Sequence, residues 1–277
     1  MLWNSEDLKQ MKEHGVDPLV VDQQIELFKN GTPPVYLDRP CTVGDGIHKI
    51  DDRRKGELIA KFDQFKSNLK VAKFVPASGA ASRMFKHLHQ ISDDSNPLVR
   101  EFKEHFHQFP FAIANQEEFP QSLNTAMEWE NVVQKIMNDS PFKFGSKPKG
   151  LIPFHGYQDE VRTPFEEHLI EAVLYGAGKN EKAHIHFTVP QASKADIQAH
   201  VDAFRAKLEE EYGVVLEVEF SVQNPGTDTI AVNEGNEPFR DQNKLFFRPG
   251  GHGALLHNLN KVDADLVFIK NIDNVVV

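Results

Sequence analysis

Apolar positions repeat with two different spacings along the chain, and these spacings predict the order of its elements. Short apolar runs rich in β-branched residues predict strands at 70–76, 183–189, 214–222 and 265–272, with a shorter one at 245–247. Apolar residues at helical spacing predict helices at 18–30, 52–68, 97–109, 116–138, 164–175, 193–211 and 253–260, with a further helix beginning near residue 82.

The order of these elements predicts an α/β protein with a mostly parallel, doubly wound sheet. Strands separated by helices give parallel neighbours because the connection has to return the chain to the same edge of the sheet. Residues 1–69 are expected to form a helical segment packed on a core that spans 70–277. Residues 90–145 are expected to be a helical insertion in that core.

Composition narrows the classes of partner. The 277 residues contain 31 Lys and Arg against 41 Asp and Glu, a net charge of −10, which argues against binding to nucleic acid or to an anionic membrane. Cys41 is the only cysteine, so neither an internal disulfide nor a multi-cysteine metal cluster can form. Without a signal-peptide pattern or a long apolar stretch, we expect a cytoplasmic protein.

The turn after the first predicted strand is the first candidate binding site. Small residues let the backbone approach a ligand, the amides that begin the following helix favour an anion, and Arg83 adds positive charge. Small residues also suit a tight turn that only packs, and this alternative stays open. The P-loop and the dinucleotide-binding glycine pattern are both missing from the chain.

Several segments, taken in order, resemble the UDP-sugar pyrophosphorylases, a group of sugar nucleotidyltransferases. The opening motif of that group, Ala-Gly-Gly-x-Gly-Thr-Arg-Met, is similar to Ala77-Ser78-Gly79-Ala80-Ala81-Ser82-Arg83-Met84, in which Ser and Ala replace two glycines. Its Pro-Lys-x-Leu-x-Pro and Thr-Pro segments match Pro148-Lys149-Gly150-Leu151-Ile152-Pro153 and Thr163-Pro164. Phe220-x-x-Gln223-x-Pro225 resembles the strand end that carries its base-reading glutamine. Arg248-Pro249-Gly250-Gly251-His252-Gly253 resembles its Pro-x-Gly-His-Gly loop, and Asn271-Ile272-Asp273-Asn274 resembles its Asn-x-Asp-Asn strand end.

The resemblance implies a function and a role for each segment. The fold would be the nucleotidyltransferase, or glycosyltransferase-A-like, type of sheet, and the reaction would join UTP and a sugar 1-phosphate into a UDP-sugar with release of pyrophosphate. Arg83 and Lys149 would have the catalytic role of neutralising the phosphates, and Asp273 would hold Mg²⁺. The nucleotide would contact Gln223 together with the turn and loop residues Ala77, Ser78, Gly79, Ala80, Ala81, Ser82, Gly250, Gly251, His252 and Gly253.

Two other functions stay open from the residues alone. The Ser78 and Ala81 replacements favour a non-catalytic module that holds a nucleotide or a partner, and another user of nucleotide sugars could share the strand-end aspartate. Each polar residue also has a plain structural interpretation, as a solvated loop lysine or a turn aspartate. In the resembled enzymes a sugar-binding half follows the last motif, so these 277 residues are expected to hold only the nucleotide-binding part.

Overall fold

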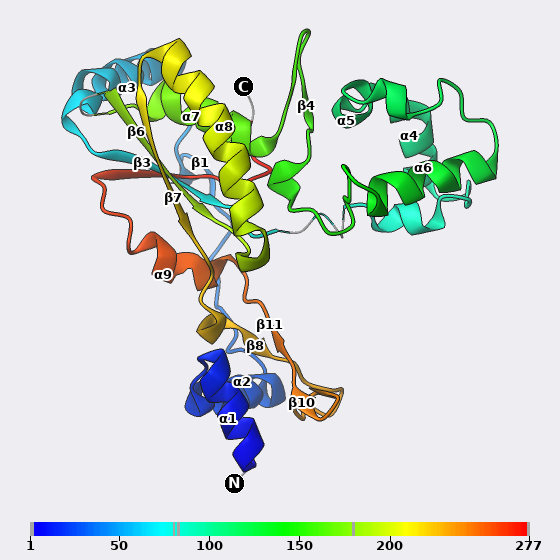
Figure 1. Cartoon of the computed structure of the whole chain (residues 1–277). Helices are drawn as coiled ribbons and strands as arrows, with labels where there is room; N and C mark the ends of the chain where they lie inside the picture. Colours follow the sequence, from blue (N-terminus) through cyan, green and yellow to red (C-terminus); the bar gives the residue numbers. More distant parts are fainter. Residues whose placement is uncertain (1–2, 80, 82–83, 179–180, 276–277) are drawn as a thin grey trace. The chain divides into compact units, whose positions relative to one another are not determined.

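The chain divides into two compact units, each described by itself. The computed structural model describes residues 3–79, 81, 84–178 and 181–275 (Figure 1). Unit 1 contains Met1–Phe65 and Gln223–Lys261, and unit 2 contains Lys66–Val222 and Val262–Val277. The sequence analysis expected a single boundary near residue 69. In the structure that boundary lies near residue 65, and residues 223–261 group with the N-terminal helices rather than with the sheet.

A four-stranded parallel sheet organises unit 2. Its strands, in spatial order, are β12 (Leu266–Ile269), β3 (Val71–Pro76), β6 (Lys182–Thr188) and β7 (Val215–Ser221). All three neighbouring pairs are parallel. This confirms the mixed α/β class and the parallel sheet that the alternating pattern predicted, with strand bounds within about two residues at most ends.

Two helices cover one face of this sheet. α7 (Pro164–Gly176) contacts β3 and β6, α8 (Lys194–Tyr212) contacts β7, and the two helices contact each other (Figure 1). The core between them is apolar, with Phe165 and Leu169 of α7 packed among Ile185 and Phe187 of β6. Thr163 begins α7 with the capping box that the sequence predicted, because its hydroxyl accepts from the Glu166 amide and the Glu166 carboxylate accepts from the Thr163 amide.

The chain adds strands to both sides of β3, and the switch from one side to the other falls between β3 and β12. From β3 the chain proceeds through β6 to β7, and it then returns to the other side of β3 to form β12. In open parallel sheets, ligands bind outside the carboxyl ends of strands at such a switch point. The carboxyl ends of β3 and β12 therefore define the edge at which a binding site is expected.

The residues inserted between β3 and α7 build a separate aromatic core. The cluster draws only on residues between Ala81 and Ile152, and Phe106 at its centre contacts Phe102, Phe111, Phe119 and Trp129. The described helices and short strands of this insertion are η3 (Lys86–Gln90), α4 (Pro97–His105), η4 (Phe106–Gln108), α5 (Pro110–Ile113), η5 (Gln116–Glu118), α6 (Ala126–Asn138), η6 (Lys149–Leu151), β4 (His155–Gly156) and β5 (Val161–Arg162). Elsewhere in unit 2, η1 (Lys66–Asn68) precedes β3 and η8 (Gln191–Ser193) follows β6.

Unit 1 consists of helices and short strand pairs around a small core. Trp3, before the first helix, and Met11 and Val21 of the first two helices pack with Ile230 and Leu245 of the second segment. Its elements are α1 (Ser5–His14), α2 (Pro18–Asn30), β1 (Thr42–Val43), β2 (Gly46–Ile47), α3 (Asp52–Phe65), η9 (Pro225–Thr227), β8 (Thr229–Ile230), β9 (Arg240–Asp241), β10 (Lys244–Leu245), β11 (Phe247–Arg248), η10 (His252–Leu255) and α9 (Leu256–Leu259). No helix in the described part of either unit is long and apolar enough to cross a membrane.

Three helix predictions need correction. α1 was not predicted, although Asn4 caps it with a capping box and Gly15 ends it in a left-handed conformation. The helix expected from 116 begins only at Ala126, because Phe119 is extended before Pro120 and Thr125 starts a new capped helix. A helix was expected to begin near residue 82, and the structure has a 3-10 helix at residues 86–90 in that region.

Candidate functional site

The turn that leaves β3 lies at the carboxyl edge of the sheet. The Ala77 amide donates to the Thr188 carbonyl of β6 at 2.8 Å, which holds the start of the turn against the sheet. Ala77 and Ala81 are fully buried in the two core clusters, whereas Ser78 is half-buried and Gly79 is exposed. The small side chains of the two alanines therefore serve packing, and Gly79 is the most exposed of the turn residues that the structure describes. Ala80, Ser82 and Arg83 lie outside the described residues.

Lys149 reaches the same edge from 70 residues further along the chain. Its amide donates to the Gly79 carbonyl at 3.2 Å, and its ammonium lies 3.1 Å from the Asp273 carboxylate. The side chain of Lys149 is 24% exposed and that of Asp273 is 55% exposed, so both remain open to solvent. The ion pair joins the loop before α7 to the segment after β12.

Close packing below Lys149 fixes the position of this loop. A Cβ on Gly150 would lie 2.4 Å from the Phe165 ring and 3.0 Å from the Ile272 side chain. Only a glycine lets the η6 backbone approach α7 and the β12 turn this closely. The Pro-Lys-Gly segment singled out in the sequence is therefore held by the first turn of α7.

Asp273 is presented by a turn that follows β12. The Lys270 amide donates to the Phe74 carbonyl and the Ile272 amide donates to the Pro76 carbonyl. Hydrogen bonding to β3 therefore continues beyond Ile269, the last residue of β12. Ile272 is buried in the core beside α7. The Asn274 amide donates to the Asn271 carbonyl at 2.9 Å and closes the turn.

A buried polar network supports this edge from inside, and the sequence analysis missed it. Lys73 in the middle of β3 is fully buried, and its ammonium lies 2.6 Å from one carboxylate oxygen of Glu171 on α7. The other oxygen of Glu171 lies 2.7 Å from the Lys270 ammonium, and the Tyr175 hydroxyl donates to the carboxylate at 2.9 Å. A lone lysine within an apolar strand is the signal that could have predicted a buried partner.

Burial and charge shift the pKa values of this network. Burial lowers the pKa of Lys73 to about 8, against the opposing attraction of Glu171. Burial acts to raise the pKa of Glu171, but hydrogen bonds from Lys270, Lys73 and Tyr175 outweigh it and bring the pKa to about 2. Burial, with the nearby charge of Lys73, lowers the pKa of His168 to about 3. Glu171 is therefore an anion and His168 is neutral near pH 7.

Gln223 and the glycine loop lie together in unit 1. The Gln223 side-chain amide donates to the Gly250 carbonyl at 3.2 Å and to the Thr227 hydroxyl at 3.4 Å. A Cβ on Gly250 would lie 2.7 Å from the Thr227 carbonyl, so this glycine is required by packing. Gly251 and Gly253 have open space where a Cβ would stand, and His252 is exposed. The structure thus brings these two predicted segments together, and it brings Gly79, Lys149 and Asp273 together in unit 2.

The donor set at Asp273 fits a cation carried by a ligand. Among the described residues there is no group of three or more His, Cys, Asp or Glu side chains that could hold a metal ion. Mg²⁺ commonly binds through one or two carboxylates together with the phosphates of its nucleotide. One exposed carboxylate beside one lysine fits that mode and does not fit a resident ion.

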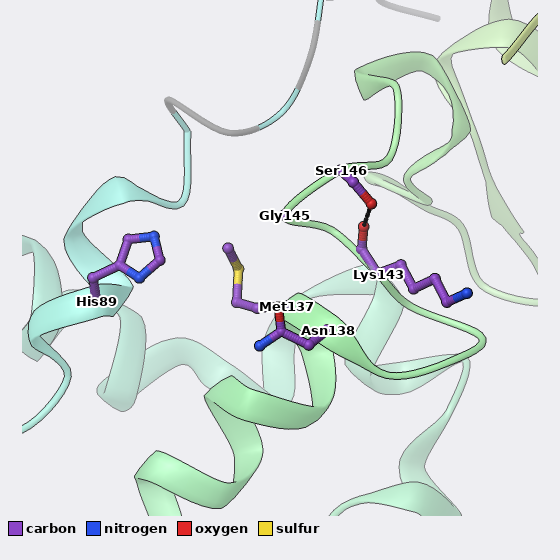
Figure 2. Close-up of a pocket in the computed structure, with 6 residues that line it drawn as sticks. All are labelled: His89, Met137, Asn138, Lys143, Gly145 and Ser146. Carbon is purple, nitrogen blue, oxygen red and sulfur yellow. Dashed lines mark hydrogen bonds between the residues drawn. The ribbon is translucent and has the colours of Figure 1, made fainter. Parts of the chain in front are cut away.

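The pocket in Figure 2 lies elsewhere, in the aromatic insertion. Its volume is about 370 Å³, and none of the predicted site residues lines it. His89 of η3 faces Met137 at the end of α6, whereas the Lys143 ammonium extends away from both (Figure 2). The Ser146 hydroxyl donates to the Lys143 carbonyl. Because its charged groups do not converge, this pocket lacks the character of a phosphate site.

Comparison with known proteins places the chain in one family. It belongs to the family described as "Domain of unknown function (DUF4301)", whose model matches residues 4–277. No curated protein and no solved structure matches the chain.

Proposed function

We propose that unit 2 binds the phosphates of a nucleoside triphosphate at the carboxyl ends of β3 and β12, and that the protein is a UDP-sugar pyrophosphorylase-like nucleotidyltransferase. One observation carries the proposal. Gly79, Lys149 and Asp273 come from three distant parts of the chain and meet at the switch point of a parallel sheet. The finer fold assignment, a doubly wound nucleotidyltransferase sheet with a glycosyltransferase-A-like arrangement, is part of the same proposal.

The residue types suit nucleotidyl transfer. In that reaction a phosphate oxygen of a sugar 1-phosphate attacks the α-phosphorus of UTP, a new oxygen–phosphorus bond forms, and the bond to the leaving pyrophosphate breaks. The nucleophile is already an anion, so the protein has to position groups and neutralise charge rather than remove a proton. Lys149 would donate to phosphate oxygens, and the exposed Gly79 would let them approach the backbone. Mg²⁺ held by Asp273 would supply further neutralisation of the phosphate charge.

Calorimetry with UTP in the presence and absence of Mg²⁺ tests the proposal. Lys149→Met should weaken binding of UTP by about 10- to 100-fold, because it removes a charge-assisted hydrogen bond worth about 1.5–3 kcal/mol. Asp273→Asn should remove the part of the affinity that depends on Mg²⁺. Equal affinity of Lys149→Met and the wild type, or no binding of UTP by the wild type, would contradict the proposal.

The chain offers a matched control at the opposite end of the same two strands. Lys70 precedes β3, Asp263 precedes β12, and their charged groups lie 2.8 Å apart. Lys70→Met and Asp263→Asn remove the same charges from the amino edge of the sheet, and they should leave UTP binding unchanged. Pyrophosphate release with a panel of sugar 1-phosphates then separates an enzyme from a module that binds without turnover.

A further inference from the structure

The turn that carries Asp273 is fastened to α7 by one buried side chain. His168 is fully buried, and its Nε2 lies 3.1 Å from the Asn271 carbonyl oxygen and 3.2 Å from the Ile272 carbonyl oxygen. Carbonyl oxygens only accept hydrogen bonds, so Nε2 must carry the proton that the two carbonyls share. These are the last two residues before Asp273.

The backbone at His168 is also tied to the sheet. The Lys73 ammonium donates to the backbone carbonyl of His168 at 3.1 Å, whereas Nδ1 of the buried ring has no hydrogen-bond partner among the described residues. Glu171 in turn pairs with Lys73 on β3 and with Lys270 at the end of β12. One turn of α7 therefore contacts both strands of the switch point and the turn that follows β12.

We propose that His168 is a positioning residue that fixes the Asp273 carboxylate through its two hydrogen bonds to the preceding turn. This rests on the proposed function, because it assigns the Mg²⁺-dependent part of nucleotide binding to a residue that touches neither the nucleotide nor the ion. The imidazole does not take part in the reaction. Without its N–H, the turn loses two hydrogen bonds to α7, while the backbone bonds to Phe74 and Pro76 and the Lys149–Asp273 ion pair remain, so the Asp273 carboxylate is held less closely in one direction.

The test compares a variant that lacks the donor with one that keeps it. His168→Leu replaces the imidazole with an apolar side chain of similar size and so removes the donor. His168→Gln keeps an N–H group that can reach a carbonyl. His200→Leu is the control, because the hydrogen bond of His200 goes to Thr163, the N-cap of α7, whereas His168 bonds to the two carbonyls of the turn.

The first measurement, amide hydrogen exchange, needs no ligand. In His168→Leu the Lys270 and Ile272 amides should exchange at least tenfold faster than in the wild type, while the β6 amides keep their protection. His168→Gln and His200→Leu should leave exchange at the turn near the wild-type rate. Unchanged exchange in His168→Leu would overturn the proposal.

The second measurement is UTP affinity with and without Mg²⁺. In His168→Leu the increase in UTP affinity that Mg²⁺ produces should be at least tenfold smaller than in the wild type, while the affinity for UTP without Mg²⁺ changes less than twofold. His168→Gln should restore the increase. Faster exchange with an unchanged gain would overturn the assignment to Asp273. If the wild type binds no UTP, the proposed function fails, and the role of His168 in holding the turn is decided by exchange alone.

One measurement on the wild type applies even if His168→Leu does not fold. Nitrogen-15 spectra of the imidazole should show a slowly exchanging proton on Nε2 and none on Nδ1. A proton on Nδ1 would overturn the proposal, because the two carbonyls would then face a lone pair.

Discussion

The Lys73–Glu171 pair should prove to be strongly coupled. Both side chains are withdrawn from water, with Lys73 fully buried and the side chain of Glu171 6% exposed. Glu171→Gln nearly preserves shape but removes the negative charge that compensates the buried ammonium. Removing one partner of such a pair costs about 3–5 kcal/mol, because an uncompensated charge then remains in the protein interior. We expect a loss of that size in the stability of the sheet.

A double-mutant cycle separates this charge effect from a loss of packing. Lys73→Met together with Glu171→Gln removes both charges and leaves an amide that Lys270 and Tyr175 can still contact. The double variant should recover most of the loss, which gives a coupling energy of about 2–4 kcal/mol. Lys270→Met is the control: its partly exposed ammonium can reach water, so we expect less than about 1 kcal/mol.

Native-state hydrogen exchange of the β3 and β6 amides is the suitable assay. It reports the free energy of opening of the sheet itself, whereas a single unfolding transition is not assured in a chain with two compact units. A coupling energy below about 0.5 kcal/mol would refute the reasoning. Lys73 would then have to be hydrated, in conflict with its complete burial.

Two further predictions concern the same region. The pKa of His168 is lowered by burial from 6.5 to about 3, so the unfolded chain binds a proton that the folded chain does not, and stability should fall as the pH drops below 6.5. This residue alone should account for about 2 kcal/mol at pH 5, and His168→Gln should lose that much less stability between pH 8 and pH 5 in urea titrations. Gly150→Ala should destabilise unit 2 by about 1–3 kcal/mol because the new methyl group meets the Phe165 ring, which thermal unfolding would detect. Gly79→Ala should be tolerated, since the nearest atom would be 3.9 Å away, and equal losses for the two alanine variants would contradict this account.

The elements that the sequence predicted well are those with a complete local signal. α7 has a capping box, a proline in its first turn and apolar residues at helical spacing, and its observed bounds match the expected 164–175 within one residue. β3 and β6 are short apolar runs in a sheet buried by helices, and they were also predicted closely. In each case the cause of the structure lies within about a dozen neighbouring residues.

The features that the sequence did not predict depend on distant contacts. Residues 223–261 interrupt the order of the sheet, and their grouping with the N-terminal helices follows from packing of Ile230 and Leu245 against Met11 and Val21. The strand at 245–247 was expected as one run but divides between two antiparallel pairs, β9–β10 and β8–β11. Neither spacing nor composition identifies Met11 and Val21 as the partners of Ile230 and Leu245, because the two sets are more than 200 residues apart in the chain.

The candidate site shows the same division between local and distant causes. The pattern placed Gly79 and Asp273 just after strands, and parallel strand ends meet at one edge, while Lys149 was expected in a loop and joined to them only through the resemblance. The internal supports could be anticipated only in part. Lys73 within an apolar strand indicates a buried partner, but nothing in the sequence identifies that partner as Glu171 or assigns His168 to the turn, and only the tertiary structure shows that they form one network.

This network ties the candidate site to α7. β12 has only four residues, and nearly 190 residues separate it from β3, the strand with which it pairs, so strand pairing alone holds its carboxyl end weakly. Glu171 joins Lys73 of β3 to Lys270, and His168 holds the two carbonyls before Asp273, so α7 supplies the carboxyl end of β12 with three polar contacts. A charged network in a core is weak evidence for added stability, because an apolar core of similar volume is often as stable. Its directional bonds, in contrast, specify one position for the turn, which is what a carboxylate just beyond a four-residue strand requires if it is to meet a ligand in a fixed geometry.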